Sequence, residues 1–171
     1  MSTSKDTPAR QAASFEALTE TSKKVNEASK RLSAAVEKMN DALKKLNLGI
    51  PVWLTFCTGG PEDGHIVETE QLGYAKVKGK WGVCIRLIIE GLSPDDDVTE
   101  WHFDSAPRDM RIRSSQFFGK LLQDLNHESL KQAKLMEERA KDIDELTASV
   151  IEIANKAHGR VSLRTSTMEA E

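Results

Sequence analysis

The stretch LGYAKVKGKWGVCIRLIIE, residues 72–90, decides the fold of this 171-residue chain. It contains two runs rich in β-forming residues, joined by Lys78-Gly79, a pair that suits a two-residue hairpin turn. With the turn at that place, Leu72 faces Ile85 across a hairpin that has one large apolar face. The other face is made of small residues, on which we expect a long helix to lie closely. These residues are Gly73, Ala75, Gly82 and Cys84.

Shorter β-segments surround this hairpin in the sequence. Val52–Cys57 is rich in β-formers and is bounded by Pro51 and by a Gly-Gly-Pro run. Trp101–Phe103 is a candidate edge strand, and His65–Glu70 is a weaker strand candidate. Residues 49–106 are therefore predicted to form a small antiparallel β-module.

A long helix is predicted for residues 8–48, before the β-module. Pro8 suits the first position of a helix, and neither Gly nor Pro follows it until Gly49. Apolar residues recur at alternating spacings of four and three, which produces a stripe that must be buried against another helix. This seam consists of Leu18, Ser22, Val25, Ser29, Leu32, Val36, Met39, Leu43 and Leu46. Small or neutral residues, such as Asn26 and Ala28, flank the seam and indicate a close contact.

A second long helix is predicted for residues 107–158. Its seam has the same spacing, with polar breaks at Gln132 and Arg139 of the kind that fix the register or the number of helices. The seam consists of Phe118, Leu122, Leu125, Ser129, Gln132, Met136, Arg139, Ile143, Leu146, Val150 and Ile153. The two ends of the chain, residues 1–7 and 159–171, are expected to be disordered tails.

These elements predict an α+β fold. Two long amphipathic helices are expected to run antiparallel, as a coiled-coil-like hairpin, and to flank the small antiparallel β-module. The order of a helix, β-hairpins and a helix resembles the layout of prefoldin-type chaperone subunits. This resemblance is one of layout, without a shared motif, and it implies a chaperone-like subunit as one candidate function.

Basic residues occupy the face of the first helix opposite its seam. They are Lys23, Lys24, Lys30, Arg31, Lys38, Lys44 and Lys45. The corresponding positions of the second helix include the acidic residues Asp124, Glu137, Glu138, Asp144, Glu145 and Glu152. We expect the two sets to form surface ion pairs within the assembly, and so to select the orientation and the partner of the helices. The alternative is that the basic residues bind a phosphate backbone or an acidic partner.

Three arginines, Arg108, Arg111 and Arg113, lie at the start of the second helix. Arginine forks can hold phosphates, but cations at a helix N-terminus oppose its dipole. A network with nearby acidic residues, including the aspartates of loop 95–97 and Glu100, is therefore favoured over an anion site.

Residues with metal-binding or catalytic chemistry do not form a recognised pattern. The candidate zinc ligands are Cys57, His65, Cys84 and His102. Their spacings lack the short pairs typical of zinc sites, so no metal site is predicted. The acidic run 95–97 lacks the glycine and the twelfth-position glutamate of a calcium loop. We therefore expect no cofactor and no enzymatic activity, and an enzyme with its site in the β-module is the least favoured alternative.

The bulk composition narrows the class of protein. The net charge is −3, and residues 49–107 contain 4 basic and 10 acidic side chains, so any nucleic acid would have to contact the helices. No apolar run is long enough for a membrane span, and two cysteines do not make a disulfide framework. The chain is therefore predicted to be a cytoplasmic, non-enzymatic interaction or assembly protein, either an adaptor or a chaperone-like subunit. We expect a homo-oligomer with a protein partner, and a nucleic-acid-associated function is the alternative.

Overall fold

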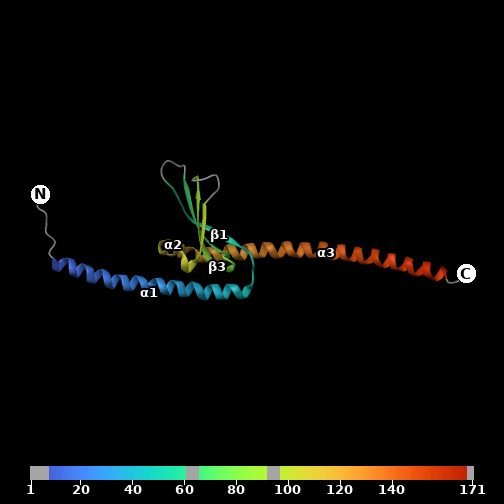
Figure 1. The fold of residues 1–171 in the computed structure, drawn as a ribbon, viewed down its shortest axis with the longest axis horizontal. Coiled ribbons are helices and arrows are strands. Elements are labelled where there is room, and N and C mark those ends of the chain that lie inside the picture. The colour runs from blue at the N-terminus through green and yellow to red at the C-terminus, as the bar shows by residue number, and fades with distance from the viewer. Residues whose placement is uncertain (1–7, 61–65, 92–96, 169–171) are drawn as a thin grey trace. The chain divides into compact units, whose positions relative to one another are not determined.

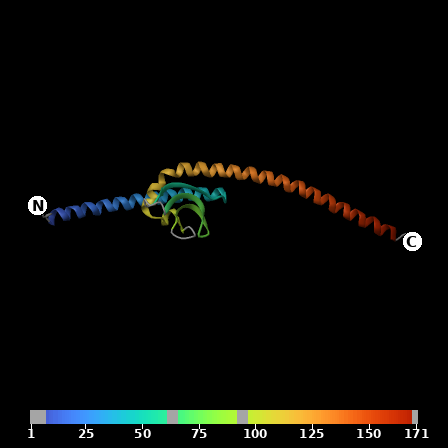
Figure 2. The same cartoon turned by 90° about the horizontal axis from the view of Figure 1, so that it is seen from above.

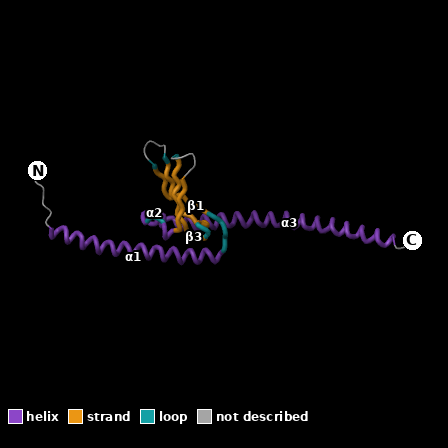
Figure 3. Tube along the Cα trace, in the orientation of Figure 1, coloured by secondary structure: helices purple, strands orange, loops and turns teal. Residues whose placement is uncertain are grey.

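The computed structural model describes residues 8–60, 66–91 and 97–168. The chain has two compact units, unit 1 up to Leu125 and unit 2 from Asn126 onward. Figures 1 and 3 show its elements. In chain order they are α1 (Pro8–Leu46), β1 (Val52–Gly59), β2 (Val67–Val77), β3 (Lys80–Glu90), β4 (Asp97–His102), a 3-10 turn (Phe103–Ser105), α2 (Arg108–Ser114), a second 3-10 turn (Ser115–Phe117) and α3 (Phe118–Met168).

The four strands form one antiparallel sheet in the order β1-β2-β3-β4. Leu72 is paired with Ile85, as the two-residue turn predicts. Lys78 and Gly79 have φ angles of 47° and 82°, and a type I′ turn requires a positive φ at both positions. The predicted mixture of helices with an antiparallel sheet is confirmed, and so is the register of the central hairpin.

Three of the strands differ in extent from the predicted segments, and β1 differs only in that it continues to Gly59. β2 begins at Val67 and runs without a break to Val77, so the weaker strand candidate continues into the first arm of the hairpin. His65 lies outside the described residues. β4 covers Asp97–His102, whereas Phe103 leaves the sheet and is buried in the core. The sequence signal of β4 is weak because the first half of this edge strand is exposed and carries few apolar side chains.

The core of unit 1 lies between the sheet, the second half of α1 and the first turns of α3. Val36 and Leu43 of α1 are buried in it, together with Leu121 and Leu125 of α3. Figure 1 shows α1 passing along the end of the sheet, and α1 packs against β3 there. The sheet and the turn after it contribute Val52, Leu72, Tyr74, Val83, Ile85 and Phe103. Because burial of one such side chain contributes about 1.5–3 kcal/mol, this cluster stabilises unit 1.

The small face of the central hairpin is covered in two different ways. A Cβ at Gly82 would lie 3.5 Å from Asn40 of α1, so the helix does approach that end of the face. A Cβ at Gly73 would meet the Trp53 ring of β1 at 2.3 Å. Arg86 stacks on the same ring, 4.2 Å from its centroid. Trp53 therefore fills the space over Gly73 that the sequence assigns to a helix.

The segment after residue 107 is interrupted, although one continuous helix is predicted there. α2 ends at Ser114, and a 3-10 turn separates it from α3. The hydroxyls of Ser114 and Ser115 donate to the carbonyls of Arg111 and Ile112. Such side-chain bonds compete with the regular helical pattern and tighten the last turn, which explains the break.

The C-terminal tail also differs from its prediction. α3 continues to Met168, so residues 159–168, which the sequence predicts as part of a disordered tail, are helical. The predicted stop rests on Gly159, and one glycine costs a helix about 1 kcal/mol, which is not enough to end it. The predicted tail at residues 1–7 lies outside the described residues.

α2 contacts the middle of α1, whereas the sequence predicts one long helix that is antiparallel to the first. Arg108 contacts Asn26, and Arg111, one turn later, contacts Ser33, so the residue numbers rise together along both helices. In Figures 1 and 2 the start of α3 has the same direction as α1. The β-module returns the chain to the middle of α1 instead of to its C-terminal end. The described contacts within unit 1 therefore do not confirm the predicted antiparallel hairpin.

Candidate protein-interaction surfaces

Three polar residues at intervals of seven attach α1 to the rest of unit 1. They are Asn26, Ser33 and Asn40, on one flank of the seam. The first two accept hydrogen bonds from Arg108 and Arg111 at 2.9 and 3.0 Å. The third accepts the backbone N–H of Val83 at 2.6 Å, beyond the point where β4 stops pairing with β3. The sequence marks this flank as a close contact, but it does not identify the donors, which come from distant segments.

The seam of α1 is buried or half-buried from Ser29 to Leu43, and its residues before and after this stretch are exposed. Val36 and Leu43 lie in the core, whereas Leu18 and Val25 are exposed to solvent. Phe15, one turn before Leu18, is 71% exposed. The 4-3 spacing is the same throughout, so spacing alone does not distinguish the part that packs within the chain from the part that does not. The first half of α1 therefore presents an apolar surface that unit 1 leaves uncovered.

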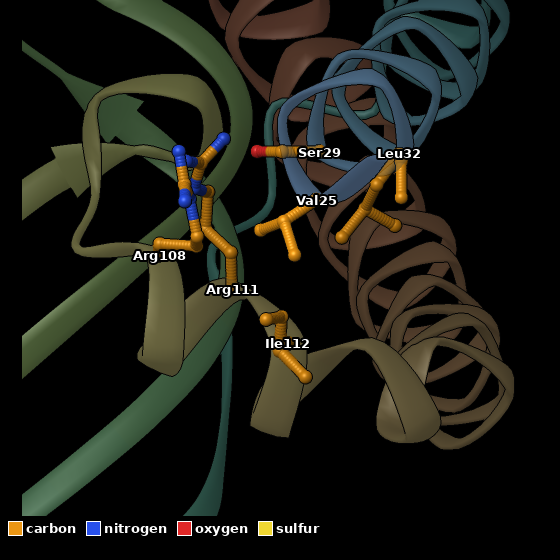
Figure 4. Close-up of a pocket in the computed structure, with 7 residues that line it drawn as sticks. Val25, Ser29, Leu32, Arg108, Arg111 and Ile112 are labelled. Atoms are coloured by element: carbon orange, nitrogen blue, oxygen red, sulfur yellow. The ribbon is translucent and has the colours of Figure 1, made fainter. Parts of the chain in front are cut away.

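A cavity of about 240 Å³ lies between α1 and α2 (Figure 4). In Figure 4 the side chains of Val25, Leu32 and Ile112 line its apolar part, and the guanidinium groups of Arg108 and Arg111 lie together at one side. Ile112 is itself largely exposed, so the apolar surface continues outside the cavity. The spacing of the seam does not reveal Ile112. The available signal is an apolar residue between two arginines in a short helix.

The three predicted arginines are divided between two surfaces. Arg108 and Arg111 face α1, and the Nε atom of Arg111 is buried without a hydrogen-bond partner in the described part of the chain. Arg113 points instead to the sheet and forms ion pairs with Glu70 at 2.8 Å and Asp109 at 2.9 Å. The expected network of Arg113 with acidic residues exists, but its partners are not the predicted ones. Asp95 and Asp96 of the predicted acidic loop lie outside the described residues.

The predicted basic surface of α1 lies on its solvent side. Its members are all exposed, and they are Lys23, Lys24, Lys30, Arg31, Lys38, Lys44 and Lys45. Lys44 forms an ion pair within the helix, with Asp41 at 3.5 Å. Acidic residues such as Glu20 and Glu27 alternate with the cations on this side. Because the cations lie opposite the buried Val36, they cannot meet acidic residues through a contact made by the seam itself.

In unit 2, the part of α3 from Asn126 to Lys156 has an apolar stripe on its surface. Its five largest seam residues are between 56 and 67% exposed, and they are Met136, Ile143, Leu146, Val150 and Ile153. Arg139 breaks the stripe and pairs with Asp142 one turn away, at 3.1 Å. Such exposed pairs within a helix contribute only about 0.3–0.5 kcal/mol each. Burial of the stripe would therefore contribute far more to stability than the surface charges do.

Cys84 and His102 are the two members of the predicted zinc set that the structure brings together. Cys84 Sγ lies 3.6 Å from His102 Nδ1, and His102 Nε2 lies 3.1 Å from the Val77 carbonyl, to which it must donate. Burial raises the pKa of the Cys84 thiol to about 12, so the thiol stays protonated. It donates to the backbone carbonyls of Ala75 and Gly82. Cys57 lies elsewhere and accepts from Arg113, while His65 is outside the described residues. Within the described ranges, no three potential ligands converge on a metal site.

Comparison of this chain with protein families, with curated proteins and with solved structures finds no match. No helix in the described ranges is long and apolar enough to span a membrane. The chemistry of the surfaces themselves is therefore the basis for a functional proposal.

Proposed function

We propose that this protein is a cytoplasmic, non-enzymatic interaction or assembly protein, an adaptor or a chaperone-like subunit, that acts through its helical seams. The observation that carries the proposal is the apolar stripe of unit 2, whose large side chains are more than half exposed from Met136 to Ile153. An exposed stripe with alternating spacings of four and three is typical of a helix that pairs with another helix.

The energy of burial supports this proposal. Full burial of one Met, Val, Leu or Ile side chain contributes about 1.5–3 kcal/mol. If half of that is realised at each of the five seam positions, these side chains contribute about 4–8 kcal/mol. This lies in the lower part of the roughly 4–15 kcal/mol entropic cost of association, so flanking residues must also pack. We therefore expect an association that uses the whole stripe together with its flanking residues.

Unit 1 supplies a folded support and a second apolar surface. The first half of the α1 seam and the α1–α2 cavity are continuous through Val25, which belongs to both. The two arginines at the cavity favour an amphipathic partner that carries acidic groups beside apolar ones. Unit 1 is therefore proposed to bind a protein partner of this chemistry.

Nucleic-acid binding by the basic face of α1 is the less favoured alternative. The cations are exposed, as phosphate contacts require, but Glu20, Glu27 and Asp41 lie among them. Intrahelical pairs of opposite charge are typical of a solvated helix face. An electrophoretic assay with duplex DNA at 50 and 200 mM salt measures this alternative, because phosphate contacts give a steep salt dependence.

An antiparallel hairpin of α1 with the part of α3 beyond unit 1 is the proposed alternative to a contact between two copies. Labels at the exposed residues Glu20 and Lys141, which lie opposite the two seams, test it by resonance energy transfer within one chain diluted into unlabelled protein. A short distance supports an intrachain hairpin, whereas a long distance excludes it.

The test of the proposed function is the mass of the full chain by light scattering. We expect a dimer or larger species at micromolar concentration, and a monomer for the double variant Met136→Asp and Ile143→Asp. The matched control is Ala148→Asp with Asn155→Asp, which adds the same charge opposite the stripe and should keep the assembly. A monomeric wild-type chain, or an assembly that the first variant leaves intact, contradicts the proposal.

A further inference from the structure

The sequence of unit 2 has a lengthwise division of charge that bears on what covers its stripe. Residues 126–141 carry four basic and three acidic side chains, whereas residues 142–156 carry one basic and four acidic side chains. All charged side chains between Lys134 and Lys156 are exposed. A helix that lies antiparallel on this one places its positive half against the negative half, and a second copy of the chain supplies such a helix.

The polar break in the stripe disfavours the parallel arrangement. Arg139 lies on the seam and is exposed, with Asp142 as its neighbour on the same helix. In a parallel, in-register pair Arg139 would face its own copy, and like charges at a seam are destabilising. In an antiparallel pair the two copies of Arg139 lie at different positions along the helices, each opposite an apolar residue along which the arginine stem can pack.

One flank of the stripe favours close approach of two identical helices. It consists of Ala133, Ala140, Thr147 and Ala154, at intervals of seven residues. In an antiparallel pair each flank faces the equivalent flank of the other helix, so small residues meet small residues. In a parallel pair the same flank would face the other side of the stripe, which carries Leu135, Asp142, Ser149 and Lys156. The small flank therefore fits a self-complementary, antiparallel contact.

We propose that residues 126–156 pair antiparallel with the same segment of a second copy of this chain. The inference rests on the proposed function and adds its partner and orientation. A segment of 31 residues provides about 45 Å of continuous seam, and the twofold symmetry of the contact closes the assembly as a dimer.

Distances between labels on the two copies test the orientation. Lys134 and Ala148 lie on the face opposite the stripe, two heptads apart, which is about 20 Å along the axis, and an antiparallel pair of residues 126–156 places them level with each other. Spin labels are placed at Lys134→Cys and Ala148→Cys in separate full-length chains with Cys57→Ser, since Cys84 is buried. Each labelled variant is first required to keep the wild-type mass.

The two orientations give opposite distance patterns. We expect a short distance when the two labelled chains are mixed, and an offset of about 20 Å along the axis between two copies of Lys134→Cys. A short distance between two Lys134→Cys copies means a parallel pair, which overturns this inference and leaves the proposed function standing. A dimer in which neither distance is short means that residues outside 126–156 form the dimer contact, which overturns the inference. A monomeric wild-type chain overturns both.

Discussion

Asn40 Oδ1 accepts a hydrogen bond from the backbone N–H of Val83 at 2.6 Å, and α1 thereby closes the edge of β3 that β4 leaves open. Val83 is fully buried, so its amide has no access to water if this acceptor is removed. Leaving such a donor unpaired costs about 1–3 kcal/mol. This one bond therefore links the attachment of the long helix to the stability of the sheet.

Substitution of Asn40 should weaken unit 1 as a whole. We expect Asn40→Leu to lower the free energy of unfolding by about 1–3 kcal/mol, measured by urea denaturation followed by tryptophan fluorescence. Glu37→Leu, on an exposed position of the same helix, is the control and should change stability by less than about 0.5 kcal/mol. Equal effects of the two substitutions would mean that the bond to Val83 contributes nothing.

The turn of the central hairpin gives a second prediction. Gly79 has a φ of 82° and Lys78 one of 47°, so a branched residue at position 79 is strained. Gly79→Val should destabilise the fold by about 1–3 kcal/mol, whereas Lys78→Asn, which suits a positive φ, should be neutral or stabilising. Thermal melts of the two variants against wild type provide the measurement. A melting temperature of Gly79→Val equal to that of wild type contradicts the assigned turn.

Cys84 predicts how stability depends on alkaline pH. The pKa of its buried thiol is about 12, raised from 9.0, so the folded protein keeps a proton that the unfolded chain releases from about pH 9 upward. The free energy of unfolding should therefore fall between about pH 9 and 12, by at most about 1.4 kcal/mol per pH unit from this group. Cys84→Ala should remove that slope when unfolding is measured in urea across this range. Cys57→Ser is the matched control for the loss of a thiol.

The basic face of α1 gives a prediction that separates ion pairing from a solvated surface. Lys23, Lys24, Lys30 and Arg31 point away from the core, so their reversal to Glu should leave the folding of unit 1 intact. If these residues pair with the acidic face of α3 in the assembly, reversal should weaken oligomerisation at low salt. Reversal of Glu137, Glu138, Asp144 and Glu145 to Lys in the same chain should then restore it. Analytical ultracentrifugation at 50 and 500 mM salt measures the association of the first variant and of the doubly reversed variant. Loss of association in the first without rescue in the second contradicts the ion pairing.

Local chemistry explains which features the sequence could predict. The register of the hairpin follows from Lys78-Gly79, because a two-residue turn fixes every pair after it. The extent of α1 follows from the lack of Gly and Pro between Pro8 and Gly49. The break near Ser114 could not be predicted, since it depends on side-chain hydroxyls and on the packing of Phe118 against Phe103, 5.5 Å apart.

The surfaces were harder to predict because the seam pattern does not encode its partner. Val36 and Leu18 occupy equivalent positions of one stripe, yet one is buried under the sheet and the other is exposed. Asn26 and Ser33 look like neutral flank residues until Arg108 and Arg111 arrive from a segment about 80 residues away in the chain. Contacts of such long sequence separation depend on the path of the β-module, which periodicity does not describe.

Arg139 gives the last prediction, because it is the one charged residue in the C-terminal half of the α3 seam, Met136–Ile153. In the proposed antiparallel pair its stem packs on an apolar neighbour, but its charge limits how tightly the helices associate. Arg139→Leu adds an apolar side chain to the seam, and we expect the dissociation constant to fall at least about tenfold, equivalent to about 1.4 kcal/mol. The substitution also removes the like-charge penalty of the parallel arrangement, so the Lys134→Cys distances should broaden to include a short component.

The control for this prediction is Lys141→Leu, which replaces a cation by leucine opposite the stripe and should alter neither the dissociation constant nor the distances. Tighter association from both variants would show that general hydrophobicity drives the effect, whereas no change from either would place Arg139 outside the contact.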